Sequence, residues 1–120
     1  YPKIDAFYQN GHAVYDFVAN EVPKYISSFL AAMKLKPAKL GAVIPHQANL
    51  RLIEQLAVKL KLPLSRFVIN VDQIGNTSSA GVAIGLAQLL ETGQRPQNVL
   101  LTGFGAGLAF GCMLVDLKNF

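Results

Sequence analysis

The chain has 120 residues, of which 52% are hydrophobic and only 15% are charged, and its formal net charge is +4. This length fits a single domain over residues 1–120, and the apolar excess excludes a disordered chain and predicts a surface that another domain or subunit covers. The basic residues are scattered rather than interleaved with aromatic ones, so we expect no nucleic-acid groove, and the single cysteine excludes an internal disulfide and a cysteine-based zinc site.

The N-terminal part of the chain predicts one short strand and one long helix. Residues 5–8 are a weak strand candidate that the turn pair Asn10-Gly11 ends. Over residues 14–33 the apolar side chains recur at three- and four-residue steps, which is the spacing of a helix with one buried face. Pro23 lies inside this run and removes a backbone donor, so we expect it either to kink the helix or to restart it.

The middle of the chain alternates between strand and helix. Residues 42–44 form a short apolar strand that Pro45 ends, and residues 48–60 follow as a second helix. The residues that this helix is expected to bury are Leu50, Ile53, Leu56, Ala57 and Leu60. Residues 67–71 contain β-branched side chains and predict a further strand.

The C-terminal part adds one helix and two strands. A turn-rich loop at residues 75–79 leads into a helix over residues 80–91 that is rich in glycine and alanine. Small side chains allow a helix to lie very close to neighbouring backbone, so we expect this helix to be the most buried one. Residues 98–103 and 108–116 are the last two strands.

The order of these elements predicts an α/β fold with parallel strands and helices on both faces of the sheet. No charge interrupts residues 99–115, but four glycines do, and a spanning helix needs about 20 apolar residues, so two buried strands explain this stretch better than a membrane helix. The N-terminus has no basic region followed by an apolar one, so we expect no signal peptide and a cytoplasmic protein.

Two polar residues follow predicted strands, where ligands bind in sheets of this kind. His46 comes after the strand at 42–44, and Asn76 comes after the strand at 67–71. Each also has a plain structural interpretation, because a histidine at this place can cap the next helix and an asparagine is a common turn residue.

The glycine-rich loop at 103–107 lacks the third glycine and the following helix that dinucleotide binding requires. It either makes a tight turn between two strands or lets backbone amides approach a ligand closely. Cys112 lies inside the last apolar strand, away from the cationic neighbour or helix N-terminus that activates a thiol, and is expected to be a core residue. The scattered acidic residues indicate neither a paired-carboxylate site nor a metal site.

Three segments together resemble the condensing enzymes of the β-ketoacyl-acyl carrier protein synthase III type, in the thiolase-like superfamily. The segments are Pro45-His46-Gln47-Ala48-Asn49-Leu50-Arg51, Gly75-Asn76-Thr77-Ser78-Ser79-Ala80 and Gly103-Phe104-Gly105-Ala106-Gly107. The resemblance implies the C-terminal half of a thiolase-like fold, with a mixed sheet and helices on both faces. It also implies that the N-terminal half, which holds the family's nucleophilic cysteine, is absent from this chain.

The family's active site is a Cys-His-Asn triad, in which His46 and Asn76 match the histidine and the asparagine. The resemblance implies that these two side chains stabilise the enolate that forms when a malonyl thioester loses its carboxylate. A neutral histidine and an amide can both donate hydrogen bonds to such an oxyanion. The backbone amide of Ala106 is similar in position to the family's second oxyanion-hole donor.

Other matches concern substrates and partners. Asn49 matches a residue that lines the pantetheine tunnel, Phe104 matches an aromatic residue near the reaction centre, and Arg51 matches a basic residue where acidic acyl carrier protein docks. The implied substrates are acyl-CoA and malonyl-acyl carrier protein, without a cofactor or metal. The full-length protein is expected to be a homodimer that initiates fatty acid biosynthesis and binds neither nucleic acid nor membranes.

The sequence leaves two alternatives open. One is a related starter enzyme of the polyketide or quinolone type, and the other is a non-catalytic thiolase-fold fragment that only binds a partner. The presence of both His46 and Asn76 argues against the second alternative. Because Cys112, the only thiol, does not match the family's nucleophile, this chain alone is expected to be inactive.

Overall fold

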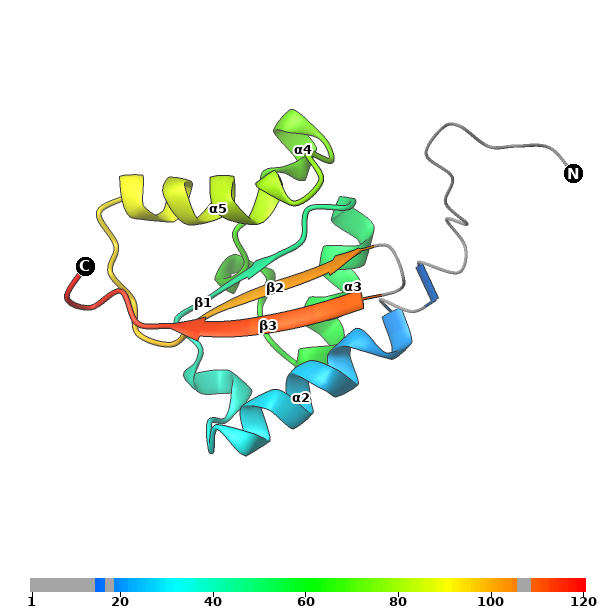
Figure 1. The fold of residues 1–120 in the computed structure, drawn as a ribbon, viewed down its shortest axis with the longest axis horizontal. Coiled ribbons are helices and arrows are strands. Elements are labelled where there is room, and N and C mark those ends of the chain that lie inside the picture. The colour runs from blue at the N-terminus through cyan, green and yellow to red at the C-terminus, as the bar shows by residue number, and fades with distance from the viewer. Residues whose placement is uncertain (1–14, 17–18, 106–108) are drawn as a thin grey trace, which may run out of the picture.

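The part of the chain that the structure describes is built around a mixed three-stranded sheet. In the computed structural model, which describes residues 15–16, 19–105 and 109–120, the strands are β1 (Ala42–Pro45), β2 (Val99–Gly105) and β3 (Ala109–Val115), in that order across the sheet. β1 and β2 run parallel, and β3 runs antiparallel to β2 (Figure 1). The three strands are confirmed with boundaries shifted by one or two residues, whereas the strand expected at 5–8 lies outside the described residues.

Helices cover both faces of this sheet, as the sequence predicted. The helices α2 (Val22–Ala32) and α3 (Leu50–Leu60) lie on one face, and α5 (Ala80–Glu91) lies on the other (Figure 1). A short helix, α4 (Val71–Ile74), precedes α5. Two 3₁₀ turns, Pro37–Lys39 and Leu64–Arg66, lead into β1 and toward α4. None of the helices in the described part of the chain has the length and apolar character that crossing a bilayer requires.

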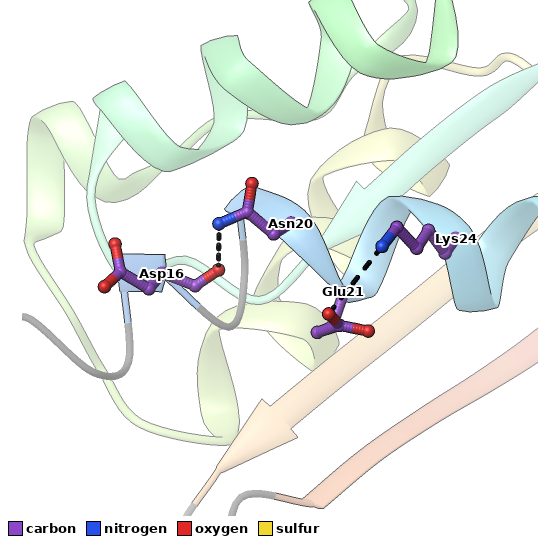
Figure 2. Close-up of polar contacts among 4 residues, drawn as sticks. All are labelled: Asp16, Asn20, Glu21 and Lys24. Atoms are coloured by element: carbon purple, nitrogen blue, oxygen red, sulfur yellow. Dashed lines mark hydrogen bonds and ion pairs between the residues drawn. The ribbon is translucent and has the colours of Figure 1, made fainter.

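Pro23 restarts the first helix rather than kinking it. Residues 19–20 are helical, Glu21 lies in a turn, and α2 then begins at Val22 with Pro23 in its first turn, where a missing N–H costs no helical hydrogen bond. Figure 2 shows the contacts around this break. The Asn20 side chain donates to the Asp16 carbonyl oxygen at 3.0 Å, and the Lys24 ammonium lies 3.8 Å from the Glu21 carboxylate.

Within the residues that the structure describes, two apolar cores hold the layers together. The larger core lies between the sheet and the helices α2 and α3, and the smaller core lies between the sheet and α5. Neighbouring strand residues alternate between them, because successive side chains of a strand point to opposite faces. Val43 and Leu100 join the larger core, while Ile44 and Val99 join the smaller one. In α3 the prediction is wrong at one position, since Leu50 is 37% exposed and Leu52 is buried in its place.

The bounds of α5 agree with the prediction, but its burial does not. Only Gly81, Gly85 and Leu89 are buried in α5, whereas α3 buries five residues, so α5 is not the most buried helix of the described chain. Both buried glycines pack closely against neighbouring residues: a Cβ on Gly85, for example, would lie 2.8 Å from Cγ2 of Ile44 in β1. The other small residues, such as Ala83, face away from the sheet and are exposed. The small side chains of α5 therefore correctly predicted its close approach to neighbouring segments, but they did not predict how much of the helix is buried.

The strand predicted at 67–71 is wrong. Phe67 makes a single parallel bridge with Val43, the next residues are extended without a ladder, and α4 begins at Val71. The Val68 N–H donates to the Val43 carbonyl at 2.9 Å, so the next bond of a parallel ladder would come from the N–H of residue 45. That residue is Pro45, which has no N–H, and the pairing therefore ends.

Candidate functional site

His46 follows β1 directly and is held there by the sheet. Its backbone N–H donates to the Thr102 carbonyl of β2 at 2.8 Å, which extends the β1–β2 pairing by one bond. Its half-buried imidazole packs edge-on against the ring of Phe104, with 4.7 Å between the ring centroids and 71° between the ring planes. The structure therefore brings together two of the residues that the sequence singled out, at the carboxyl ends of two parallel strands.

The surroundings of His46 favour its neutral form. Burial lowers the pKa of His46 below its ordinary value of 6.5. A neutral imidazole carries one N–H donor and one acceptor nitrogen. At neutral pH this side chain can therefore donate a hydrogen bond to a developing oxyanion without offering an acidic imidazolium proton.

Asn76 lies in the exposed loop between α4 and α5. Its side-chain oxygen accepts a hydrogen bond from the backbone N–H of Ser78 at 2.9 Å, which makes the local turn expected of asparagine. The positive φ angles of this loop belong to two nearby residues, Gly75 with a φ of 74° and Ser78 with a φ of 60°. Since the turn uses the amide oxygen, the NH₂ group of Asn76 is the half of the amide that remains to donate to a ligand.

The loops that carry His46 and Asn76 meet at α5. Gln47, the residue after His46, and Thr77, the residue after Asn76, both approach Gly81. A Cβ on Gly81 would lie 2.9 Å from Cβ of Gln47 and 3.2 Å from the hydroxyl oxygen of Thr77. The two candidate catalytic residues therefore adjoin a common contact point, although they are separated by thirty positions in the sequence.

Gln47 is a residue that the sequence analysis missed. Its side chain is fully buried and forms four hydrogen bonds: Nε2 donates to the carbonyls of Pro45 at 2.9 Å and Val68 at 3.0 Å, while Oε1 accepts from the backbone N–H groups of Asn70 at 2.9 Å and Val71 at 3.1 Å. A signal for this role was present in the sequence, because a proline at the end of a buried strand leaves a neighbouring carbonyl without its usual donor.

Asn49 and Arg51 lie at the start of α3, and both are exposed. Asn49 is the N-cap of the helix, and its side-chain oxygen accepts from the backbone N–H of Leu52 at 2.9 Å. Arg51 lies in the first turn, two residues after Asn49. The capping bond gives Asn49 a structural task, and the substrate roles expected for both residues stay predictions.

The structure describes Cys112 but not Ala106. Ala106 lies outside the described residues, so its expected role as a backbone donor stays a prediction. Cys112 lies on β3 opposite Thr102 and packs, half-buried, against the larger core. Burial raises the pKa of the Cys112 thiol, and the neighbouring Thr102 hydroxyl only partly opposes this effect. A thiol in this setting is a poor nucleophile at neutral pH.

Among the described residues, no three His, Cys, Asp or Glu side chains lie together as a metal site would require. The candidate site offers the neutral imidazole of His46 beside the ring of Phe104, and the amide of Asn76 in the loop between α4 and α5, and both groups can donate hydrogen bonds.

Comparison with known proteins gives one consistent family. The family model for the C-terminal part of 3-oxoacyl-[acyl-carrier-protein] synthase III matches residues 30–117. The chain is 50% identical over 115 residues to beta-ketoacyl-[acyl-carrier-protein] synthase III 1 of Lactiplantibacillus plantarum, covering 96% of this chain and 35% of that protein. It is 44% identical to the synthase III of Fusobacterium nucleatum, covering 88% of this chain and 33% of that protein.

Solved structures show the same similarity in three dimensions. The 3-oxoacyl-(acyl carrier protein) synthase III of Pseudomonas aeruginosa PAO1 matches with a TM-score of 0.88 and 31% identity, covering 99% of this chain and 39% of that one. The priming β-ketosynthase of the R1128 polyketide pathway matches with a TM-score of 0.79 and 33% identity, covering 95% of this chain and 36% of that one. The chain spans about a third of the length of the curated relatives that it matches.

Proposed function

We propose that this chain, which belongs to the 3-oxoacyl-[acyl-carrier-protein] synthase III family and matches its C-terminal part, carries the enolate-stabilising half of a condensing active site. The reaction is the condensation of an acyl-CoA starter with malonyl-acyl carrier protein, which initiates fatty acid biosynthesis. The observation that carries the proposal is the half-buried His46, with its lowered pKa, next to Phe104 at the carboxyl end of β1.

In the proposed decarboxylation, the bond between the malonyl carboxylate and the α-carbon breaks and CO₂ leaves. The electron pair of that bond forms an enolate, whose negative charge lies largely on the thioester oxygen. His46 and the NH₂ group of Asn76 donate hydrogen bonds to this oxygen. Because neither group is acidic at neutral pH, neither one quenches the carbanion before it attacks the acyl carbonyl.

The acyl group in this reaction is carried by a cysteine. Cys112 is half-buried with a raised pKa, so we propose that the nucleophile comes from a segment of the protein outside these 120 residues. In the completed site, the backbone amide of Ala106 would stabilise the oxyanion of the acyl-enzyme. We expect the 120 residues alone to form neither an acyl-enzyme nor a condensed product.

The proposal assigns the remaining residues to substrate binding. Asn49 would line the pantetheine tunnel, and the exposed Arg51 would meet the acidic surface of acyl carrier protein. The full-length enzyme would be a cytoplasmic homodimer that needs no cofactor beyond its thioester substrates.

A second candidate is a priming enzyme of a polyketide pathway. The similarity to the R1128 priming β-ketosynthase, at 33% identity, supports this second candidate function. Both candidates use the same decarboxylative chemistry and differ in the acyl starter and in the carrier protein. Competition between acetyl-CoA and longer acyl-CoA starters, on fatty-acid and polyketide carrier proteins, would distinguish them.

The test uses the full-length enzyme and measures two partial reactions separately. His46→Ala and Asn76→Ala should each lower the rate of malonyl-thioester decarboxylation about 100-fold or more, which is the usual effect of removing one oxyanion donor. Acylation of the nucleophilic cysteine, followed by mass spectrometry, should change little.

Cys112→Ala is the matched control and should leave both partial reactions near the level of the unsubstituted enzyme. If the acyl group were found on Cys112 and moved from there to product, the assignment of the nucleophile would be wrong. Unchanged decarboxylation in both His46→Ala and Asn76→Ala would contradict the proposed function itself.

A further inference from the structure

We infer that Gln47 is a positioning residue for the condensing site, one that fixes the His46 loop relative to the Asn76 loop. The inference rests on the proposed function, since it concerns how those two donors come to face one oxyanion. The side chain of Gln47 is buried next to the candidate site rather than exposed to a substrate, so it would act through its neighbours.

Four hydrogen bonds hold the side chain of Gln47 in place. These bonds join two segments of the chain. Nε2 donates to the carbonyl of Pro45, two residues before Gln47, and to the carbonyl of Val68 in the segment that precedes α4. Oε1 binds the backbone N–H groups of Asn70 and Val71, at the start of α4. Both N–H donors and both oxygen lone pairs of the amide are therefore used within the protein.

Gln47 also contacts the start of α5. Gly81 lies so close to Gln47 that a Cβ there would be 3.0 Å from Cγ of Gln47, and Thr77 reaches the same point. Asn70, which is also fully buried, donates from its side chain to the Gly81 carbonyl and to the Gln88 side chain, both at 3.2 Å. Gln47 therefore contacts the segment that carries Asn76 at both of its ends, Asn70–Val71 and Gly81.

This arrangement has a direct consequence for the chemistry. His46 is the residue before Gln47, and Asn76 lies five residues after Val71, so a shift of the Gln47 amide changes the separation of the two donors. A misplacement of about 1 Å in an active site can cost up to about 100-fold in rate. Acylation depends on the cysteine and its own surroundings, and it should be affected much less.

The experiment substitutes Gln47→Met in the full-length enzyme, which keeps the length of the side chain and removes all four hydrogen bonds. We expect malonyl-thioester decarboxylation per folded molecule to fall about 10- to 100-fold, while cysteine acylation changes less than about threefold. Hydrogen exchange at the Asn70 and Val71 amides should become faster. Gln88→Met is the matched control, because it removes a bond of the same network on the α5 side and should leave the ratio of the two rates unchanged.

A milder variant keeps the inference testable if Gln47→Met does not fold. Gly81→Ala places a methyl group against Gln47 without removing any hydrogen bond, and Gly85→Ala makes the same change one turn later, against Ile44. We expect Gly81→Ala, but not Gly85→Ala, to lower decarboxylation relative to acylation.

Equal losses in both partial reactions, or no loss for either Gln47→Met or Gly81→Ala, would overturn the inference. These outcomes leave the proposed function intact as long as His46→Ala still blocks decarboxylation alone. If the unsubstituted full-length enzyme does not decarboxylate malonyl thioester at all, the proposed function fails instead.

Discussion

The ring of Phe104 meets the imidazole of His46 edge-on, with the two centroids 4.7 Å apart, and so covers part of the candidate catalytic histidine. We predict that Phe104→Ala raises the pKa of His46 toward its ordinary value, because water then reaches the imidazole and stabilises its charged form. An NMR titration of the imidazole protons would measure this, with His46→Asn used to assign the signals. A pKa that stays unchanged or falls would show that Phe104 does not control the hydration of His46.

The lowered pKa of His46 also predicts how stability depends on pH. The folded state binds a proton at His46 less readily than the unfolded state does, so the free energy of unfolding should decrease as the pH falls below the ordinary value of 6.5. Above that value the imidazole is neutral in both the folded and the unfolded state, so this loss of stability is absent. Urea unfolding at about pH 8 and about pH 5.5 would show a smaller difference for His46→Asn than for the unsubstituted protein. An identical difference in the two proteins would contradict the prediction.

Asn49 should reveal two separable tasks. Asn49→Ala removes the cap of α3 and should lower the free energy of unfolding by about 1 kcal/mol, whereas Asn49→Ser preserves a capping oxygen and should restore most of it. Thermal unfolding measures this difference. If Asn49 also binds pantetheine, both variants should raise the KM for the thioester substrate, because neither keeps the amide. If the KM of Asn49→Ser is normal, Asn49 acts only as the helix cap.

Arg66 stabilises the entry to β1 from a distant part of the sequence. Its guanidinium donates to the backbone carbonyls of Leu40 at 2.5 Å and Ala38 at 3.4 Å. Arg66→Met should lower the free energy of unfolding by about 1 to 2 kcal/mol, because the carbonyl of Leu40 loses a charged donor. Lys59→Met removes the same charge from an exposed position of α3 and should change stability by less than about 0.5 kcal/mol. Similar losses in both variants would indicate that net charge, rather than this contact, matters.

Local signals in the sequence predicted most of the elements. The helix over Ala80–Glu91 was predicted to the residue, since its start follows a turn-rich loop and its end precedes Gly93, which has a φ of 82°. The short strand ended by Pro45 was predicted as well. These features depend on neighbours within a few positions, which the sequence displays directly.

The sequence could not reveal what depends on distant partners. The apolar run at 67–71 has the composition of a strand, but whether it pairs depends on an N–H from residue 45. The juxtaposition of His46 and Phe104 follows from the register that places Pro45 opposite Thr102, and no local pattern shows this register. The resemblance placed His46 and Phe104 in one site, whereas the partners of the Gln47 side chain emerged only from the structure.

The missing N–H of Pro45 makes residues 45 and 47 an epistatic pair. A residue with an N–H at position 45 would offer the Val68 carbonyl a second donor, in competition with the amide of Gln47. The energetic value of Gln47 therefore depends on which residue occupies position 45, and the effects of substituting the two positions should not add. Anyone who transplants this loop, or diversifies it in a library, has to vary positions 45 and 47 together.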